Sequence, residues 1–406
     1  MTTIDRHTHR AWLLAHFEHL LDFGRRTPVD GGGAAWLDDD GAPIAEEGAQ
    51  TWITCRTVHT YSLGALLGLP GARPIAQAAL DGLTGRMRDV EGGGWHGQVG
   101  GVVPEPAVKA AYQHAFVVLA ASSGVLAGLD GAQPLLADAL RVMEERFWDE
   151  EYGRVVDTWN DDFTELDPYR GINANMHTVE AFLAAADVTG DRLWLDRAAR
   201  IGAFAAAAAK ANDWRLPEHF DAEWNALLEY NADRPADPFK PYGATVGHGL
   251  EWARLLLNLE AAGAEGADWA EAAVALFDAA VEDGWDEEIG GFVYTTDWAG
   301  NPVVPDRMHW VVAEAIGAAA TLWRRTGDDR YAELYQRYWD YADAHLIDRE
   351  RGSWRHQLDG ENRPADTTWR GKPDLYHAAQ ATLIPQLPLA PTMASAIARN
   401  LWEPAS

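Results

Sequence analysis

The chain has 406 residues, of which 47% are hydrophobic and 23% are charged, a balance typical of a folded globular protein and not of a disordered one. Acidic residues outnumber basic ones by 62 to 33, giving a net charge of −29, which argues against nucleic acid and densely anionic substrates as partners. No stretch stays apolar for the roughly 18 residues that cross a membrane, and the polar start MTTIDRHTHRAWLL lacks the apolar run of a signal peptide. We therefore predict a cytoplasmic protein that binds neither nucleic acid nor membrane.

The cysteine and tryptophan contents narrow the chemistry further. Cys55 is the single cysteine, which excludes an intrachain disulfide and a cysteine-rich zinc site. The chain has 19 tryptophans, and each brings a large apolar area together with an N–H group that needs a partner. We interpret most of them as core residues and the others as walls of a pocket that stacks on flat, partly apolar faces such as sugar rings.

Helices are predicted where apolar residues recur with a period near 3.6. In residues 107–126 these positions are Val108, Ala111, Ala115, Val118, Leu119 and Leu126. The same pattern occurs in residues 133–147, 177–188, 193–209, 246–261, 269–281, 310–323 and 331–346. Gly-Asp pairs at Gly190 and Gly327 mark two of the breaks between helices.

Short hairpins are predicted in the long gaps between pairs of helices. Residues 147–160 (FWDEEYGRVVDTWN) resemble residues 284–297 (GWDEEIGGFVYTTD), and related pieces lie near Gly33, Gly93 and Gly352. A sixth, weaker copy surrounds Glu218. The six centres are spaced by roughly 59 to 73 residues, which indicates a chain built from six similar units.

Six units of helix, turn, helix and long loop can bury their apolar stripes by closing into a ring. We therefore predict an all-α fold, an (α/α)6 barrel that forms a single domain over residues 1–406, with the hairpins in the long loops at one end. An open helical solenoid is the alternative, but it needs polar capping repeats, which the Trp-rich ends of this chain do not resemble.

Polar and aromatic residues occur at the start of each predicted inner helix. The six groups are Trp52, Arg56 and His59; Tyr112 and His114; Asn173 and His177; His248, Glu251 and Trp252; His309, Trp310 and Glu314; and Asp374 and His377. Several of them are three or four residues apart and so share one helix face. Burying such groups costs several kcal/mol unless they are paired or hydrated, so we predict that they meet around a wet pocket on the barrel axis.

The other histidines and the missing motifs set limits on this site. His16, His19, His219, His345 and His356 lack assignable partners, and we interpret them as structural. The chain has no Walker or dinucleotide-binding glycine loop, no nucleophile elbow and no HExxH motif. A metal site formed by His177, His248 and His377 is the remaining metal alternative, but neighbouring carboxylates form no ligand cluster in the sequence, so we predict no metal ion.

Four segments carry a family resemblance: GINANMHTVEA (171–181), GHGLEWARLLL (247–257), HWVVAEAI (309–316) and WRGKPDLYHAAQATLIP (369–385). They resemble the N-acylglucosamine 2-epimerase superfamily, and within it the aldose–ketose isomerase branch, from Trp52 to Pro385. The resemblance implies an (α/α)6 barrel, a monosaccharide substrate and no cofactor or metal. It matches the family's axial histidines to His177, His248 and His377, and its other site residues to Arg56, Asn173, Glu251, Trp310 and Glu314.

The resemblance further implies interconversion of D-mannose and D-fructose through an enediolate, with D-lyxose and D-xylulose as a second pair. His377 is then expected to carry the proton between C2 and C1, because neutral imidazole titrates close to working pH. His248, oriented by Glu251, is the expected second acid/base. His177 with Asn173 is expected to assist ring opening, and Arg56 to polarise the carbonyl.

The remaining predicted site residues are assigned to substrate binding. Trp52, Trp310 and Trp369 are expected to pack against the sugar and Glu314 to bind its hydroxyl groups. The set is completed by His59, Tyr112, His114, Trp252 and Asp374. We expect the protein to be a monomer or a homodimer.

Other functions remain open from the sequence. Within the family they are sulfoquinovose isomerisation and 2-epimerisation of mannose or cellobiose, since the same residues serve both reactions. A more distant alternative is an inverting glycoside hydrolase that uses Glu251 with Glu314 or Asp374. The third class is a non-catalytic sugar-binding protein with a Trp-rich mouth.

Overall fold

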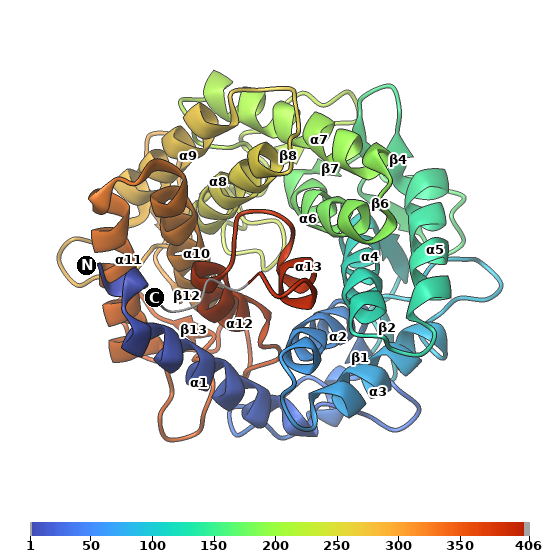
Figure 1. Cartoon of the computed structure of the whole chain (residues 1–406). Coiled ribbons are helices and arrows are strands. Elements are labelled where there is room, and N and C mark those ends of the chain that lie inside the picture. The colour runs from blue at the N-terminus through green and yellow to red at the C-terminus, as the bar shows by residue number, and fades with distance from the viewer. Residues whose placement is uncertain (1, 402–406) are drawn as a thin grey trace.

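The computed structural model describes residues 2–401. A ring of inner helices surrounds a central axis, and a ring of outer helices covers it (Figure 1). The inner helices are α2 (Thr51–Leu66), α4 (Ala111–Leu126), α6 (Ile172–Thr189), α8 (Val246–Ala261), α10 (His309–Thr326) and α12 (Tyr376–Leu383). The outer helices are α1 (His7–Phe23), α3 (Ala72–Thr84), α5 (Ala132–Val142), α7 (Arg192–Ala211), α9 (Trp269–Gly284) and α11 (Asp329–Tyr341).

The ring is closed where its two ends meet. Helix α12 packs against α1, α2 and α10, so the last inner helix joins the first unit of the barrel. This confirms the (α/α)6 barrel expected from the six repeats and rules out the open solenoid. Residues 1 and 402–406, which the predicted single domain includes, lie outside the described residues.

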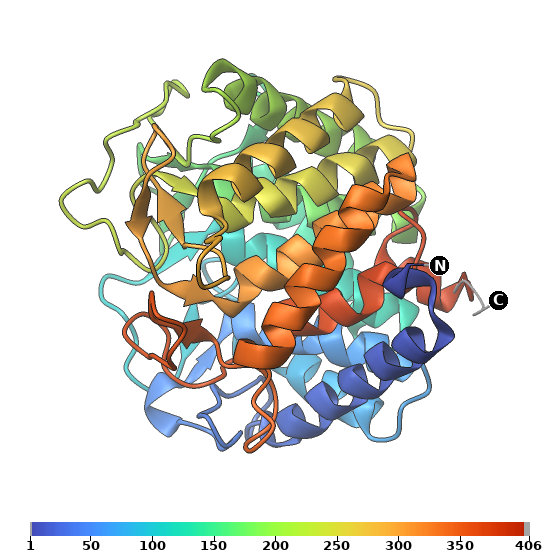
Figure 2. The ribbon, with the colours of Figure 1, turned by 90° about the vertical axis from the view of Figure 1, so that its left-hand side faces the viewer.

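Short antiparallel strands gather at one end of the barrel, on the left of Figure 2. The paired strands are β1 (Ala49–Gln50) with β2 (Gln98–Val99), β3 (Val108–Ala110) with β6 (Thr158–Asn160), β4 (Trp148–Asp149) with β5 (Arg154–Val155), β7 (Arg170–Gly171) with β8 (His219–Phe220), and β12 (Arg307–Met308) with β13 (Gln357–Leu358). A three-stranded sheet joins β9 (Ala244–Thr245), β10 (Thr295–Thr296) and β11 (Pro302–Val304). The predicted hairpins are therefore confirmed as very short ladders.

These strands fix where the inner helices begin. Strands β1, β3, β7, β9 and β12 each end one residue before an inner helix, and each pairs with a strand of the following long loop. For example, Gly171 pairs with His219 immediately before α6 begins at Ile172. The first turns of these helices are thereby held at the same end of the barrel.

The helix bounds differ from prediction where strands or wider turns intervene. Residues 108–110, predicted as helix, form β3 because they pair with β6. Helix α6 begins at Ile172, five residues earlier than predicted, which places Asn173 in its first turn. The predicted segments 133–147 and 331–346 both end in a π-helical turn, at Met143–Phe147 and Ala342–Leu346.

The inner helices are buried on almost every side. In α2, every residue from Thr51 to Gly64 is buried, because neighbouring inner helices flank it and α3 covers it from outside. A helix surrounded in this way needs apolar or small residues all round, so a polar residue on it stands out. Within residues 2–401, no helix is long and apolar enough to cross a membrane.

The opposite end of the barrel is covered by the C-terminal segment. Helix α13 (Met393–Ala398) packs against α2, α4 and α6 and appears near the axis in Figure 1. A cavity lies beneath this segment, and His59, Glu180, Arg254 and Met393 are among its lining residues. The two ends of the barrel therefore differ, since strands and long loops surround one and α13 covers the other.

Helix α3 supports the loop that leads to the first inner helix through a backbone contact. A Cβ atom on Gly82 would lie 2.6 Å from Gly33 Cα and 2.7 Å from Gly32 carbonyl carbon, distances that backbone atoms cannot relieve by rotating. We predict that Gly82→Ala lowers the free energy of unfolding by about 1–3 kcal/mol, the usual cost of overpacking. Urea denaturation measures this change.

Gly124→Ala in α4 is the matched control for this substitution. Its Cβ would meet side-chain atoms, Leu80 Cδ1 at 3.0 Å and Ala132 Cβ at 3.1 Å, and side-chain atoms yield more easily than backbone. A loss of stability in Gly124→Ala equal to or larger than that in Gly82→Ala would contradict the argument.

Candidate active site

A pocket of about 680 Å³ opens at the end of the barrel that carries the strands. It is lined by twelve of the residues selected from the sequence: Trp52, Arg56, Tyr112, Asn173, His177, His248, Glu251, His309, Trp310, Trp369, Asp374 and His377. They come from the starts of the inner helices and from the loop before α12. The convergence predicted from helix spacing is thus present in the structure.

Four predicted site residues lie outside this pocket. His59 lines the cavity at the opposite end, where its Nδ1 is 2.7 Å from Ser123 Oγ. His114 is structural, because its Nε2 accepts a hydrogen bond from the Trp95 amide and its Nδ1 donates to Ala110 carbonyl oxygen. Trp252 is completely buried, and Glu314 lies behind the pocket wall. For His59, His114 and Trp252, the helix face that each occupies points away from the site.

His377 is held by a buried carboxylate. It is the second residue of α12, and its Nδ1–H donates to Glu314 Oε1 over 2.8 Å. Arg254 Nε donates in turn to Glu314 Oε2 over 3.0 Å. Glu314 was expected to bind sugar hydroxyl groups, but both of its oxygens are engaged here and it is 1% exposed, so it orients His377 instead.

The His377 imidazole is kept neutral. Burial, followed by the positive charge of Arg56, lowers its pKa well below the usual value of 6.5. Burial also raises the pKa of Glu314, but Arg254 opposes this and favours leaving the negative charge on the carboxylate. The shared proton then resides on Nδ1, which leaves Nε2 as an acceptor.

His248 has a carboxylate partner that the sequence reasoning did not assign. Its Nδ1–H lies 2.9 Å from Glu218 Oε2 and 3.0 Å from Oε1, whereas Glu251 had been expected in this role. Glu218 directly precedes β8 and its carbonyl oxygen accepts from the amide of Ile172, so the β7–β8 pairing positions it. The sequence predicts the hairpin around Glu218, but a single acidic residue in a loop gives no indication of its partner.

His177 is the third histidine with carboxylates nearby. Its Nδ1 is 3.7 Å from Glu180 Oε2 and 3.9 Å from Glu251 Oε1, too far for hydrogen bonds. Its ring packs edge-on against Tyr112, with centroids 5.2 Å apart. Burial and the Arg56 charge outweigh the effect of Glu180, so the pKa of His177 falls to about 4.

Arg56 brings the positive charge of the pocket. Its Nη1 donates to Asp374 Oδ2 over 3.0 Å and its Nη2 donates to the Tyr112 hydroxyl over 3.2 Å. The guanidinium also lies 4.8 Å from the Trp52 ring and 4.7 Å from the Tyr376 ring. It is 6% exposed, so its charge acts in a medium that screens it poorly.

Aromatic rings form the walls and rim of the pocket. Trp310 lies between two catalytic candidates, with centroids 5.3 Å from His248 and 5.7 Å from His377. At the rim, Trp369 meets Trp52 and, edge-on, Phe239 at 5.3 Å. Phe239 belongs to the loop of residues 212–245, which also carries Glu218, so one loop supplies both the carboxylate partner of His248 and part of the rim.

A stacked pair of histidines forms another wall. The rings of His309 and His356 lie 3.8 Å apart, and both line the pocket. His356 Nε2–H donates to Asp374 carbonyl oxygen over 3.1 Å, which ties it to the loop that holds Arg56. His356 had been interpreted as a structural residue outside the site; the β12–β13 pairing brings its backbone next to His309, a contact that sequence separation conceals.

Two groups of buried ligand atoms at the site resemble metal sites. They are His177, Glu180 and Glu251, and Glu251, Glu314 and His377, with all ligand atoms of each group within 4.8 Å. Arg254 Nη2 donates to Glu251 Oε1 over 3.4 Å, in addition to its bond to Glu314. A guanidinium therefore already provides the cation that these carboxylates need, which argues against a metal ion there.

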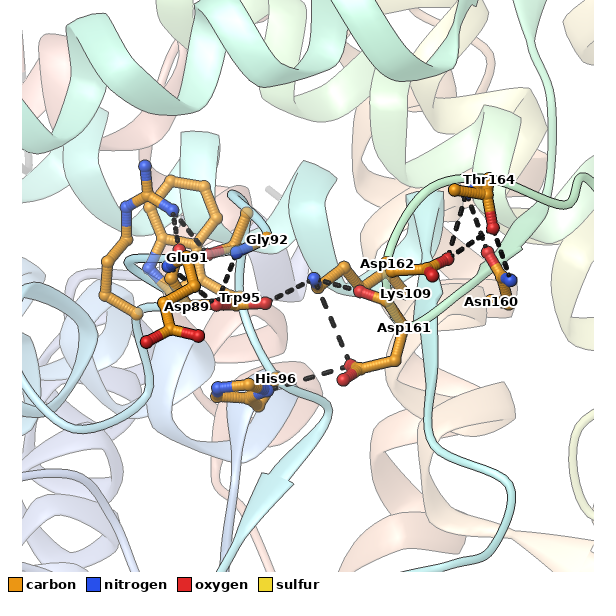
Figure 3. A network of polar contacts seen from close by, with 12 residues as sticks. Asp89, Glu91, Gly92, Trp95, His96, Lys109, Asn160, Asp161, Asp162 and Thr164 are labelled. Atoms are coloured by element: carbon orange, nitrogen blue, oxygen red, sulfur yellow. Dashed lines mark hydrogen bonds and ion pairs between the residues drawn. The ribbon is translucent and has the colours of Figure 1, made fainter.

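A third such group lies in the loops outside the pocket and consists of Asp89, His96 and Asp161. Figure 3 shows Lys109 between the two aspartates, with dashed lines to Asp89 and to Asp161. Lys109 Nζ lies 2.6 Å from Asp89 Oδ2 and also donates to the carbonyl oxygen of Asp161. Lys109 is fully buried, and we interpret this network as an anchor between the loops before and after α4 and α5.

The fold and the pocket together define a class of protein. A closed (α/α)6 barrel whose axis carries carboxylate-supported histidines is an enzyme scaffold suited to proton transfer. The sequence profile of the N-acylglucosamine 2-epimerase (GlcNAc 2-epimerase) family matches residues 32–381. The chain therefore belongs to the N-acylglucosamine 2-epimerase family.

Individual relatives match over nearly the whole chain. A D-mannose isomerase of Thermobifida fusca is 51% identical over 399 residues, covering 97% of this chain and 98% of that protein. A D-mannose isomerase of Pseudomonas cannabina pv. alisalensis is 44% identical over 404 residues, covering 96% and 95%. A crystal structure of a D-mannose isomerase superposes with a TM-score of 0.87 at 29% identity, covering 92% of this chain and 97% of the other.

The protonation of His377 is directly measurable. We predict that its imidazole is neutral at pH 6, with the proton on Nδ1, because burial and Arg56 lower its pKa well below 6.5. Protonation then begins only as the pH falls well below 6.5. Nitrogen-15 NMR of histidine-labelled protein reports both charge and tautomer, and the spectrum of His377→Asn assigns the signal. An imidazolium signal from His377 at pH 6 would refute this prediction.

Proposed function

We propose that the protein is an aldose–ketose isomerase that interconverts D-mannose and D-fructose through an enediolate, without a metal ion or cofactor. The observation that carries this proposal is the pair of imidazoles beside Trp310. His248 and His377 each donate from Nδ1 to a buried carboxylate, and their Nε2 atoms have no hydrogen-bond partner among residues 2–401. Two imidazoles that each hold Nδ1 in a hydrogen bond and keep Nε2 free are suited to removing a proton from the substrate and returning one to it.

The isomerisation moves one proton on carbon and one between oxygens. His377 Nε2 takes the C2 proton of the open-chain aldose, and C1, C2 and the two oxygens become an enediolate. His377 returns a proton to C1, which gives the ketose. His248 moves the proton between O1 and O2. Each such acid–base contribution is worth about 10²–10⁴-fold in rate.

Arg56 is suited to the negative charge of the enediolate. Asp374 and Tyr112 hold its guanidinium, and burial keeps water from competing with it. A fixed cation aimed at an oxygen that gains charge lowers the barrier without reorganisation. Asn173 and His177 lie beside it in the pocket and are assigned to opening the sugar ring.

The positions of the carboxylates argue against a glycoside hydrolase. An inverting hydrolase needs two carboxyl groups about 6.5–9.5 Å apart on either side of the bond. The ligand oxygens of Glu251 and Glu314 lie within 4.8 Å of each other, and Arg254 binds both. Glu314 also lies outside the pocket lining, so the pair is positioned to support histidines.

The proposal extends to the protein as a whole. We infer one catalytic domain, acting as a monomer or homodimer in the cytoplasm on a monosaccharide. D-Lyxose and D-xylulose are the second substrate pair, because D-lyxose matches D-mannose from C1 to C4. The charge of −29 supports an uncharged substrate over a sulfonated sugar.

Incubation with D-mannose in D₂O tests the reaction. We expect fructose carrying deuterium at C1, because His377 exchanges its proton with solvent during turnover, and we expect EDTA to leave the rate unchanged. His377→Asn should lower kcat by about 10²–10⁴-fold, while His19→Asn, on the exposed face of α1, should retain the wild-type rate. Formation of glucose in place of fructose, or loss of activity with EDTA, would contradict the proposal.

Glu218 supplies a second test. We predict that Glu218→Gln lowers kcat for D-mannose by about 10- to 100-fold, because His248 loses the carboxylate that orients its ring. KM should change little, since the Glu218 side chain does not line the pocket. Glu223→Gln, exposed in the same loop, is the control. Steady-state assays of fructose formation decide, and wild-type kcat in Glu218→Gln would remove this role.

A further inference from the structure

The helix that carries His377 begins differently from the other inner helices. Within residues 2–401, a strand directly precedes each of the other five, whereas α12 follows a loop that has no strand at its end. With eight residues, α12 is also the shortest inner helix of this part of the chain, and a turn that contains Pro385 follows it at once. A contact other than strand pairing must therefore fix the rotation of α12 about its own axis.

A buried carboxylate from the opposite side of the barrel makes such a contact. Glu180 lies on α6, which packs between α4 and α8, whereas α12 packs between α10 and α2 across the central axis (Figure 1). Glu180 Oε1 accepts from Gln380 Nε2 over 3.1 Å, and Glu180 Oε2 accepts from the Tyr376 hydroxyl. Tyr376 and Gln380 are four residues apart, so they share one face of α12. The Glu180 carboxylate thus bridges two successive turns of the helix.

The bridge from Glu180 is charged and shielded from water. Burial by itself would raise the pKa of Glu180, but the neighbouring His177, the charge of Arg254 and the Tyr376 hydroxyl hold this pKa well below the usual 4.5. Glu180, Tyr376 and Gln380 are all buried, so water does not compete for their hydrogen bonds. Hydrogen bonds to an ionised acceptor are about twice as strong as those between neutral groups. The bridge is therefore suited to holding the start of α12 in one orientation.

The rotation of α12 determines where the His377 imidazole lies. His377 follows Tyr376 directly, and the two rings pack edge-on with centroids 4.8 Å apart. The bond from His377 to Glu314 orients the imidazole about its side-chain bonds, but the position of the ring depends on the helix. A rotation of about 10° moves an atom about 6 Å from a helix axis by about 1 Å. A misplacement of that size can cost about 10²-fold in rate.

We propose that Glu180 is a positioning residue for His377. Its bridge to α12 fixes the rotation of that helix, and thereby the approach of His377 Nε2 to C1 and C2 of the sugar. Glu180 does not line the active-site pocket, so it acts through α12 and not on the substrate. The effect on turnover rests on the proposed function, whereas the bridge itself does not.

Two substitutions of Glu180 separate this role from an electrostatic effect on His177, whose Nδ1 lies 3.7 Å from Glu180 Oε2. Glu180→Ala removes both the bridge and the charge. Glu180→Gln removes the charge but can keep the bridge, because its carbonyl oxygen accepts from the Tyr376 hydroxyl and its amino group can donate to Gln380. The Gln380 amide needs only to turn over, since its Oε1 has no hydrogen-bond partner among residues 2–401.

Steady-state assays of fructose formation compare these variants, each checked for native circular dichroism. We expect Glu180→Ala to lower kcat for D-mannose by about 10- to 100-fold and to leave KM nearly unchanged. Glu180→Gln should keep most of the wild-type kcat, and Glu333→Ala, on the exposed face of α11, should match wild type. Equal losses of kcat in Glu180→Ala and Glu180→Gln would overturn the positioning role, because they would show that the charge matters and the bridge does not.

Tyr376→Phe tests the bridge from its other end. It removes the hydroxyl that binds Glu180 and keeps the ring. The variant should lower kcat by less than Glu180→Ala does, because Gln380 still binds the carboxylate. Adding Tyr376→Phe to Glu180→Ala should cause no further loss, since both substitutions act on one bridge. Losses that multiply in the double variant would contradict the proposal, and so would a wild-type kcat in Tyr376→Phe, whether or not Glu180→Ala folds.

Hydrogen–deuterium exchange of backbone amides tests the bridge without a substrate. Glu180→Ala should speed exchange in residues 376–383 of the intact protein, while exchange in the outer helix α3 stays as in wild type and Glu180→Gln matches wild type throughout. This pattern in a protein that forms no fructose would refute the proposed function and retain the bridge. Unchanged exchange of α12 in Glu180→Ala would overturn the positioning role even if the protein is an isomerase.

Discussion

The site depends on backbone pairing between strands of only two or three residues. Each of β1, β3, β7, β9 and β12 directly precedes an inner helix and is hydrogen-bonded to a strand of the next long loop. Because a helix can then neither slide nor rotate at its start, side chains of the first turn reach the axis in a fixed direction. Isolated two-residue pairings have little stability of their own, so the barrel and its ladders support one another.

Buried charge is the second constraint, and it is arranged around two arginines. Arg254 binds Glu251 and Glu314, and Arg56 binds Asp374. A buried ion pair is weak evidence for stability, because desolvation offsets much of the attraction. Its effect here is positional, since the carboxylates that these arginines neutralise lie beside the imidazoles of His177 and His377. The polar centre of the barrel is thus organised in layers, with bases facing the pocket and ion pairs behind them.

The sequence predicted the barrel and most of the pocket because both follow from periodicity. Helix α8 has the predicted bounds, and polar residues at the starts of inner helices, such as Arg56 and His377, do meet. Contacts between side chains that lie far apart in the sequence leave no periodic pattern, so they could not be predicted in this way. Glu218 and His356 lie in loops, and their positions are set by the β7–β8 and β12–β13 pairings. The prediction that His114 lines the pocket was wrong for a different reason. Helical spacing alone does not distinguish an imidazole that faces the pocket from one that accepts a hydrogen bond from a neighbouring loop.

The loop of residues 212–245 makes several of the contacts that shape the site. It pairs with the strand before α6, supplies Glu218 to His248, contributes Phe239 to the rim and ends in the strand before α8. A change in the length of this loop that widens the mouth of the pocket therefore also disturbs the orientation of His248, the proposed second acid–base residue. The size of sugar that the pocket admits and the orientation of His248 therefore depend on the same loop. A designer who grafts this loop from a relative must also transfer the carboxylate that binds His248.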